Sequence, residues 1–177
     1  MTLAGTKVSH YELRELLGRG AMGEVWLADD LHLPRQVAVK LLPPHQSGER
    51  DAIDRLLREA RAAASVDHPA VVTVYEAGIA EDRPYVVMQR VEGETLEALL
   101  RKGPLPVPTA IALASQIADA LAEVHALGIV HRDLKPSNVI WTSRGAKLLD
   151  FGLASIKSAM DQTRTAGSVG TPIYMSP

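Results

Sequence analysis

His131-Arg-Asp-Leu-Lys-Pro-Ser-Asn138 follows a long helical pattern and is the most informative string in the chain. Its six or seven specified positions would coincide by accident roughly once in ten million start sites if residue types were equally frequent. A charged turn after a helix would explain the polarity of the string but not the spacing of Asp133, Lys135 and Asn138. The string therefore indicates a site built from these side chains.

A second string, Asp150-Phe-Gly152, follows a strand-like segment at 146–149. By itself this tripeptide is common and is more often a turn than a site. It therefore counts only in combination with the other motifs.

Gly18, Gly20 and Gly23 fall in the string G-R-G-A-M-G-E-V. This spacing lets backbone amides approach a phosphate where a Cβ would obstruct them. The alternatives are a simple hairpin turn and a dinucleotide-binding turn, which requires a helix directly after the glycines. Residues 24–28 instead alternate as a strand does, which favours a glycine-rich hairpin lying over a nucleotide.

Lys40 lies in an apolar strand, where alternation places it on the same face as Ala38. From this motif alone, an edge-strand lysine that reaches solvent along its stem is an equally good interpretation. Glu59 is a candidate partner because it flanks the apolar stripe of a predicted helix. In isolation, a solvated glutamate paired with an arginine such as Arg55 would be the commoner case.

Periodicity divides the chain into a strand-rich half and a helical half. Strands are predicted at 11–17, 24–28, 36–42, 71–76 and 84–89, with a helix at 51–65. Helices at 95–100 and 107–127 follow, the second opened by prolines and ended by Gly128. Because the pattern changes near Glu92 and Gly93, we expect an N-terminal extension at 1–9 and two parts at 10–92 and 93–177.

The composition is that of an ordinary globular domain, with 177 residues and 46% hydrophobic side chains. A net charge of −2, spread along the chain, gives no reason to expect a nucleic-acid partner. The absence of cysteine and the spacing of the six histidines argue against a structural zinc site. No signal-peptide pattern and no run of eighteen apolar residues occurs, so we expect no membrane span and a cytoplasmic location.

Together and in this order, these strings resemble the catalytic domain of protein kinases, in the style of the eukaryotic-like Ser/Thr kinases of bacteria. The resemblance covers essentially the whole chain from His10 onward. It implies an α+β fold with an N-terminal five-stranded antiparallel sheet plus one helix, followed by a mainly helical C-lobe. The family continues with further helices where this chain has Pro177, so an incomplete C-lobe is expected.

The resemblance implies transfer of the γ-phosphoryl group of ATP to Ser/Thr hydroxyls of proteins. Asp133 would accept or orient the hydroxyl proton, and Lys135 would stand near the transferring phosphate. Asn138 and Asp150 would ligate Mg²⁺, since hard oxygen donors suit that ion.

The resemblance also implies which residues hold the nucleotide. Lys40 would hold the α- and β-phosphates and be oriented by Glu59. Adenine would lie among apolar side chains, with Met88 behind it and the backbone of 89–91 pairing with its edge. The implied contacts are Gly18, Arg19, Gly20, Ala21, Met22, Gly23, Val25, Ala38, Lys40, Met88, Gln89, Val91 and Ile140.

Arg132 precedes Asp133, and in kinases with this pair the arginine captures a phosphorylated activation loop. The candidates for that phosphate are Thr163 and Thr165, which we expect to be autophosphorylated, although both also suit a merely polar loop. Thr171 would bond Asp133 and Lys135 and help to admit Ser/Thr substrates.

Two other functional classes stay open at this point. A truncated nucleotide-binding or interaction module without catalysis is disfavoured because the five polar site residues are all present. A small-molecule phosphotransferase with a kinase-like fold is disfavoured by Lys135 and by the segment around Thr171. We also expect the 177-residue chain alone to have uncertain activity and uncovered apolar surface on the helix at 107–127.

Overall fold

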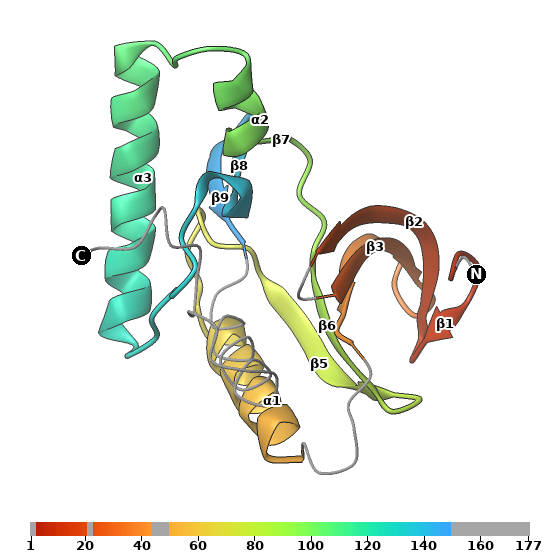
Figure 1. The fold of residues 1–177 in the computed structure, drawn as a ribbon. Coiled ribbons are helices and arrows are strands. Elements are labelled where there is room, and N and C mark those ends of the chain that lie inside the picture. The colour runs from red at the N-terminus through yellow and green to blue at the C-terminus, as the bar shows by residue number, and fades with distance from the viewer. Residues whose placement is uncertain (1–2, 21–22, 44–49, 150–177) are drawn as a thin grey trace, which may run out of the picture. The chain divides into compact units, whose positions relative to one another are not determined.

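The computed structural model describes residues 3–20, 23–43 and 50–149, with backbone only for some residues of the first helix, including Glu59. The chain forms two compact units (Figure 1). The first contains residues 1–64 and 73–90, and the second contains Ser65–Val72 and the chain from Val91 onward. Residues 65–72 thus belong to the second unit, although the sequence analysis grouped them with the first part.

The first unit is built on a six-stranded antiparallel sheet with the order β1-β2-β3-β4-β6-β5. Its strands are β1 (Lys7–Val8), β2 (Tyr11–Gly20), β3 (Gly23–Asp30), β4 (Gln36–Leu41), β5 (Val74–Ala80) and β6 (Arg83–Gln89). The five predicted strands are present, and the two-residue β1 is an addition at the edge. Strand β5 corresponds to the strand predicted at 71–76. It starts at Val74 and not at Val71, because the backbone at 70–72 hydrogen-bonds to Leu148 in the second unit.

One helix, α1 (Arg50–Ala64), packs against β5 in this unit (Figure 1). Its buried positions include Ala60 and Ala63, which lie on the predicted apolar stripe. Small side chains at these positions let the helix approach the strand closely.

The sheet of the first unit has two different faces. Directly opposite residues in an antiparallel pair share a face, so the pairs Val25 with Lys40 and Ala38 with Met88 place these four side chains together. Trp26, Val39 and Val87 occupy the other face and belong to a buried apolar cluster that also contains Tyr11, Leu13 and Tyr85. One face therefore packs the core, while the other carries the predicted site residues.

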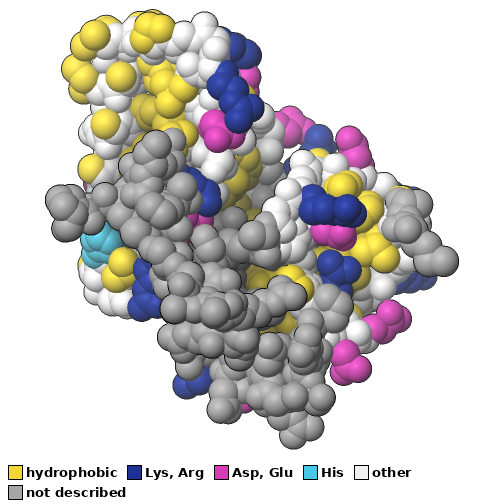
Figure 2. Space-filling model, viewed as in Figure 1, with side chains coloured by type: hydrophobic (Ala, Val, Ile, Leu, Met, Phe, Trp, Pro, Cys, Tyr) yellow, Lys and Arg dark blue, Asp and Glu magenta, His cyan; other side chains and the backbone are white. Residues whose placement is uncertain are grey.

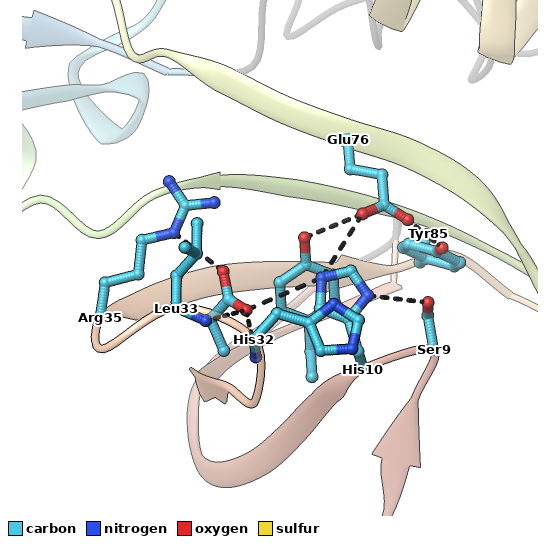
Figure 3. A network of polar contacts seen from close by, with 9 residues as sticks. Ser9, His10, His32, Leu33, Arg35, Glu76 and Tyr85 are labelled. Atoms are coloured by element: carbon cyan, nitrogen blue, oxygen red, sulfur yellow. Dashed lines mark hydrogen bonds and ion pairs between the residues drawn. The ribbon is translucent and has the colours of Figure 1, made fainter.

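A polar network ties β2, β5 and β6 together beside this core (Figure 3). The hydroxyls of Tyr11 and Tyr85 both donate to the carboxylate of Glu76, at 2.8 and 2.5 Å. The ring of His10 stacks on that of His32 with centroids 4.1 Å apart. One acidic side chain thus satisfies two tyrosines whose rings are buried in the core.

Asp30 organises the turn between β3 and β4. Its carboxylate accepts from the backbone amides of His32 and Leu33 and from Nε of Arg35, at 3.0, 3.1 and 2.9 Å. Burial alone would raise the pKa of Asp30, but these donors outweigh it and the pKa is lowered. The buried carboxylate is therefore ionised and holds the turn.

Up to residue 149, the second unit contains two α-helices, a short 3₁₀ helix and a small antiparallel sheet. The elements are β7 (Glu94–Thr95), α2 (Leu96–Arg101), α3 (Val107–Ala126), the 3₁₀ helix Pro136–Asn138, β8 (Val139–Thr142) and β9 (Gly145–Leu148). The Thr95 side chain caps α2 by accepting from the amide of Ala98. The sequence analysis predicted both helices and the region of β9, but not β7 or β8.

Helix α3 is long and apolar enough to cross a membrane, by length and composition only, and core helices of soluble domains share these features. Its buried residues are Leu113, Ala120 and Val124. Val107 and Ile111 are 70% and 64% exposed, and Figure 2 shows hydrophobic side chains gathered over that end of the helix. The predicted uncovered apolar surface on this helix is therefore present.

The Tyr11–Glu76 hydrogen bond generates a prediction about alkaline pH. Burial, followed by the bond to Glu76, raises the pKa of Tyr11 above the unfolded value of about 10. Above that pH the unfolded chain releases a proton that the folded chain retains, so the free energy of unfolding falls as pH rises. Tyr11→Phe should reduce this slope, by at most about 1.4 kcal/mol per pH unit, the limit for one proton.

Urea unfolding at several pH values between about 9 and 11 would measure the slope. Tyr75→Phe is the matched control, because Tyr75 is exposed and its slope should equal that of the unchanged protein. Equal slopes for all three proteins would contradict the prediction.

Candidate active site

The loop between α3 and β8 carries the string His131–Asn138. The loop enters the 3₁₀ helix Pro136–Asn138 through Lys135, whose backbone is extended, and the amide of Asn138 donates to the carbonyl oxygen of Lys135. Arg132 has a positive φ of 63°. This left-handed conformation is rare for a residue with a long side chain, so the surrounding contacts must hold the turn in place.

The buried side chain of Asn138 holds the loop by hydrogen bonds to Asp133. Its Nδ2 donates to the backbone carbonyl oxygen of Asp133 at 2.8 Å and lies 3.3 Å from Oδ2 of the same residue. Both partners are acceptors, so the orientation of the amide is determined. Asn138 and Asp133 are 8% and 7% exposed, and the bond is correspondingly shielded from water.

Asp133 is also paired with Lys135, whose Nζ lies 2.6 Å from Oδ2. The carboxylate is almost fully buried, whereas the lysine side chain is 24% exposed. A buried carboxylate requires donors of this kind to remain charged. The loop thus presents an ionised acid and a partly exposed ammonium group side by side.

His131 connects this loop to the strand that precedes Asp150. Its Nε2 donates to the carbonyl oxygen of Leu149 at 2.9 Å, and its Nδ1 accepts from the amide of Asp133 at a longer 3.4 Å. A carbonyl oxygen can only accept, so this pair of bonds describes a neutral ring with the proton on Nε2. The sequence analysis left His131 out of the site, and the structure places it as a support for Asp133.

Asn138 is the expected Mg²⁺ ligand whose surroundings the structure describes. Its Oδ1 has no donor within the described part of the chain, although the side chain is buried. An uncompensated buried oxygen is unfavourable for the protein alone and fits a hard cation. The amide of Leu149 donates to the carbonyl oxygen of Asn138, so residue 149, which precedes Asp150 in the sequence, is bonded to Asn138.

No group of three His, Cys, Asp or Glu side chains that could hold a metal occurs among the described residues. Asp150 itself lies outside them, as do Ala21, Met22, Thr163, Thr165 and Thr171. Glu59 lies in α1, but its side chain is not described.

Lys40 is held in the middle of the sheet of the first unit. It lies in β4 between Val25 of β3 and Val86 of β6, and only 4% of the residue is exposed. A lysine that reaches solvent from an edge strand is therefore excluded, since β4 is flanked on both sides. A buried ammonium group requires an anionic partner or ligand.

The glycine-rich segment is a β-hairpin, as predicted, formed by β2 and β3 with Gly20 opposite Gly23. Among the described residues, no atom outside the neighbouring residues lies within 4 Å of the positions that a Cβ would take at Gly18 and Gly20. Gly23 differs: its φ is 110°, and a Cβ there would overlap the carbonyl oxygen of Leu41. The protein's own packing therefore requires glycine at Gly23, whereas Gly18 and Gly20 leave room for a ligand.

The residues expected around adenine are divided between the units. Val25, Ala38 and Met88 lie on the Lys40 face of the first unit, and the amide of Gln89 donates to the carbonyl oxygen of Thr73. Val91 and Ile140 belong to the second unit, where Ile140 lies in β8 opposite Lys147.

Arg19 was expected to contact the nucleotide. The structure places its guanidinium on Glu24, with Nη2 2.9 Å from Oε1, and the two residues face one another across the hairpin. Sequence reasoning missed Glu24, although its position directly after the third glycine could have drawn attention to it.

Residues 11–177 match the family model described as a protein kinase domain. This chain belongs to the protein kinase family. It is 39% identical over 178 residues to Ser/Thr protein kinase PrkC of Bacillus subtilis and 41% identical over 174 residues to Ser/Thr protein kinase PknB of Mycobacterium leprae.

The same fold occurs in solved bacterial kinases. The kinase domain of Mycobacterium tuberculosis PknI superposes with a TM-score of 0.79 at 32% identity, covering 88% of this chain and 63% of that one. The curated relatives are longer than this chain. The alignment with PrkC covers 99% of this chain but 28% of PrkC, and the alignment with PknB covers 94% of this chain but 28% of PknB. The α+β, kinase-like fold with a partial C-lobe is thus confirmed.

The contrast between the glycines generates a second prediction. Gly23→Ala should lower the free energy of unfolding by about 1–3 kcal/mol, because a Cβ meets backbone at a positive φ. Gly20→Ala, where no atom is near, should change it by less than about 0.5 kcal/mol. Denaturant titration of the two variants checks this, and equal destabilisation would refute the assignment of different roles.

Proposed function

We propose that this chain is the nucleotide-binding and catalytic region of a protein Ser/Thr kinase, which transfers the γ-phosphoryl group of ATP to Ser/Thr hydroxyls. The observation that carries the proposal is the buried Asp133–Lys135–Asn138 cluster in a chain that belongs to the protein kinase family. We further expect this region to act in the cytoplasm, where ATP is available.

Phosphoryl transfer requires positioning and charge neutralisation more than covalent help from the protein. Asp133 is ionised and held rigidly by Asn138, so it can orient the attacking hydroxyl and accept its proton. Lys135 is partly exposed beside it and supplies a positive charge for the transferring phosphate. A lysine in this place suits the negatively charged phosphate and does not compete with Asp133 for the hydroxyl proton.

Mg²⁺, when bound with ATP, would neutralise phosphate charge. Asn138 would contribute its Oδ1, which has no donor among residues 3–20, 23–43 and 50–149, and Asp150 is the proposed second ligand. Lys40 is the proposed partner of the α- and β-phosphates, supported by its burial on the sheet face that it shares with Val25, Ala38 and Met88. Glu59 is proposed to orient Lys40, and Thr171 to bond Asp133 and Lys135.

The direct test is phosphate transfer from radiolabelled ATP to a generic protein substrate. Asp133→Asn keeps the size and the acceptor oxygen but removes the base, and should lower the rate at least about 100-fold. Asp119→Asn is the matched control, because Asp119 lies on α3 with its side chain 80% exposed. Its rate should equal that of the unchanged protein.

ATP binding without transfer in the unchanged protein would favour a non-catalytic nucleotide-binding module. Transfer to an aminoglycoside or choline but to no protein would favour a small-molecule phosphotransferase. Either result would overturn the proposal.

We also propose autophosphorylation of the intact protein at Thr163 or Thr165. Arg132 supports this, because its side chain is exposed and a phosphate of about −1.5 to −2 charge would pair with its guanidinium. Phosphopeptide mapping of active protein should find at least one of the two threonines modified, and Asp133→Asn protein should lack the phosphate. Active protein with neither threonine modified would contradict the proposal.

A further inference from the structure

The carboxylate of Glu24 lies on the face of the hairpin opposite to the nucleotide residues. Val25 is directly opposite Lys40, so their side chains share a face of the sheet. Successive residues of a strand point to opposite faces, which places Glu24 and Trp26 together on the other side. Glu24 therefore cannot contact a nucleotide bound on the Lys40 face.

Glu24 joins three parts of the first unit. Oε1 pairs with Nη2 of Arg19 at 2.9 Å, while Oε2 accepts from Nε1 of Trp26 at 3.0 Å and lies 3.6 Å from Nη2 of Arg83. Arg83 in turn donates from Nε to the carbonyl oxygen of Leu42 at 2.7 Å. The tip of the glycine-rich hairpin is thus connected through Glu24 to β6 and to the end of β4.

These contacts keep Glu24 charged. Its side chain is 16% exposed, and the indole of Trp26, followed by the two arginines, lowers the pKa of Glu24 against the opposing effect of burial. Trp26 is itself 3% exposed and is part of the core. The carboxylate is therefore fixed in the hydrogen-bond network of the sheet.

Arg19 lies between Gly18 and Gly20, whose missing side chains leave the backbone at the hairpin tip with few restraints. Among the described residues, the Arg19–Glu24 pair is the side-chain contact that restrains this tip. Resting on the proposed function, we propose that Glu24 is a positioning residue: through Arg19 and Arg83 it holds the glycine-rich hairpin in place over the triphosphate of ATP. It also keeps the Arg19 guanidinium away from the Lys40 face.

Glu24→Gln tests this in the intact protein, since the amide retains an acceptor for Trp26 and nearly the same volume but loses the charge. The affinity for Mg²⁺-ATP should fall about threefold to tenfold, in the lower part of the range for coupled neighbours. The affinity for adenosine, which lacks phosphates, should not change. Arg19→Gln should also weaken ATP binding, and the double variant should lose little more than Glu24→Gln alone, because both substitutions remove the Arg19–Glu24 pair.

Glu12→Gln is the matched control. Glu12 lies on the same hairpin and pairs with an arginine, Arg14, at 2.9 Å, but at the end far from the glycines. Its affinities for ATP and adenosine should both equal those of the unchanged protein.

The possible outcomes separate the two proposals. Glu24→Gln protein that binds ATP as tightly as the unchanged protein overturns the positioning role and leaves the kinase proposal intact. Loss of ATP and adenosine binding in equal proportion, with a lower melting temperature, also overturns it, because that result indicates a general structural role. Failure of the unchanged protein to bind Mg²⁺-ATP instead overturns the proposed function itself.

Discussion

The site in the second unit depends on the hydrogen bond from the side-chain amide of Asn138 to the backbone carbonyl of Asp133. Burying a carboxylate is unfavourable by several kcal/mol unless donors replace the lost water. The Asn138 amide satisfies the loop backbone, Lys135 satisfies the carboxylate, and the carbonyl oxygen of Asn138 accepts from Leu149. One asparagine therefore closes the loop, holds the proposed base and fixes the end of the strand that leads to Asp150, while its own Oδ1 keeps no donor among the described residues.

In the first unit the constraint is different, because one sheet must supply both a core and a binding surface. The register does this by alternation: Trp26, Val39 and Val87 enter the apolar cluster, while Val25, Ala38, Lys40 and Met88 lie on the opposite face. A slip of one residue in β4 would exchange Lys40 with Val39 and bury a charge in the core. Polar contacts on the core side reinforce this register: the tyrosine hydroxyls donate to Glu76, and Glu24 pairs with Arg19. These contacts are directional, whereas apolar packing gives little directional preference.

Local patterns predicted the elements well, and long-range contacts account for what they missed. Alternation and glycine spacing were sufficient for the hairpin, for the strand that carries Lys40 and for the helices, since each is determined by neighbours in sequence. Residues 71–72 have the apolar character of a strand, but the carbonyl oxygen of Ala70 and the amide of Val72 bond to Leu148, far along the chain, and the periodicity of the sequence does not predict this pairing. The same applies to His131, whose role depends on the carbonyl oxygen of Leu149, eighteen residues further along the chain.

Helix α3 shows why composition alone is an insufficient guide. Its length and mean hydropathy permit a membrane span, yet two of its polar side chains have partners inside the unit. Gln116 accepts from the backbone amide of Ala146 in β9 at 2.8 Å, and Asp119 lies 3.4 Å from His68. A helix surrounded by lipid could not hold these contacts to a solvated sheet and loop, and an ionised Asp119 would be costly at the centre of a bilayer. The polar side of α3 therefore contacts the rest of the unit, while its apolar end at Val107 and Ile111 is exposed.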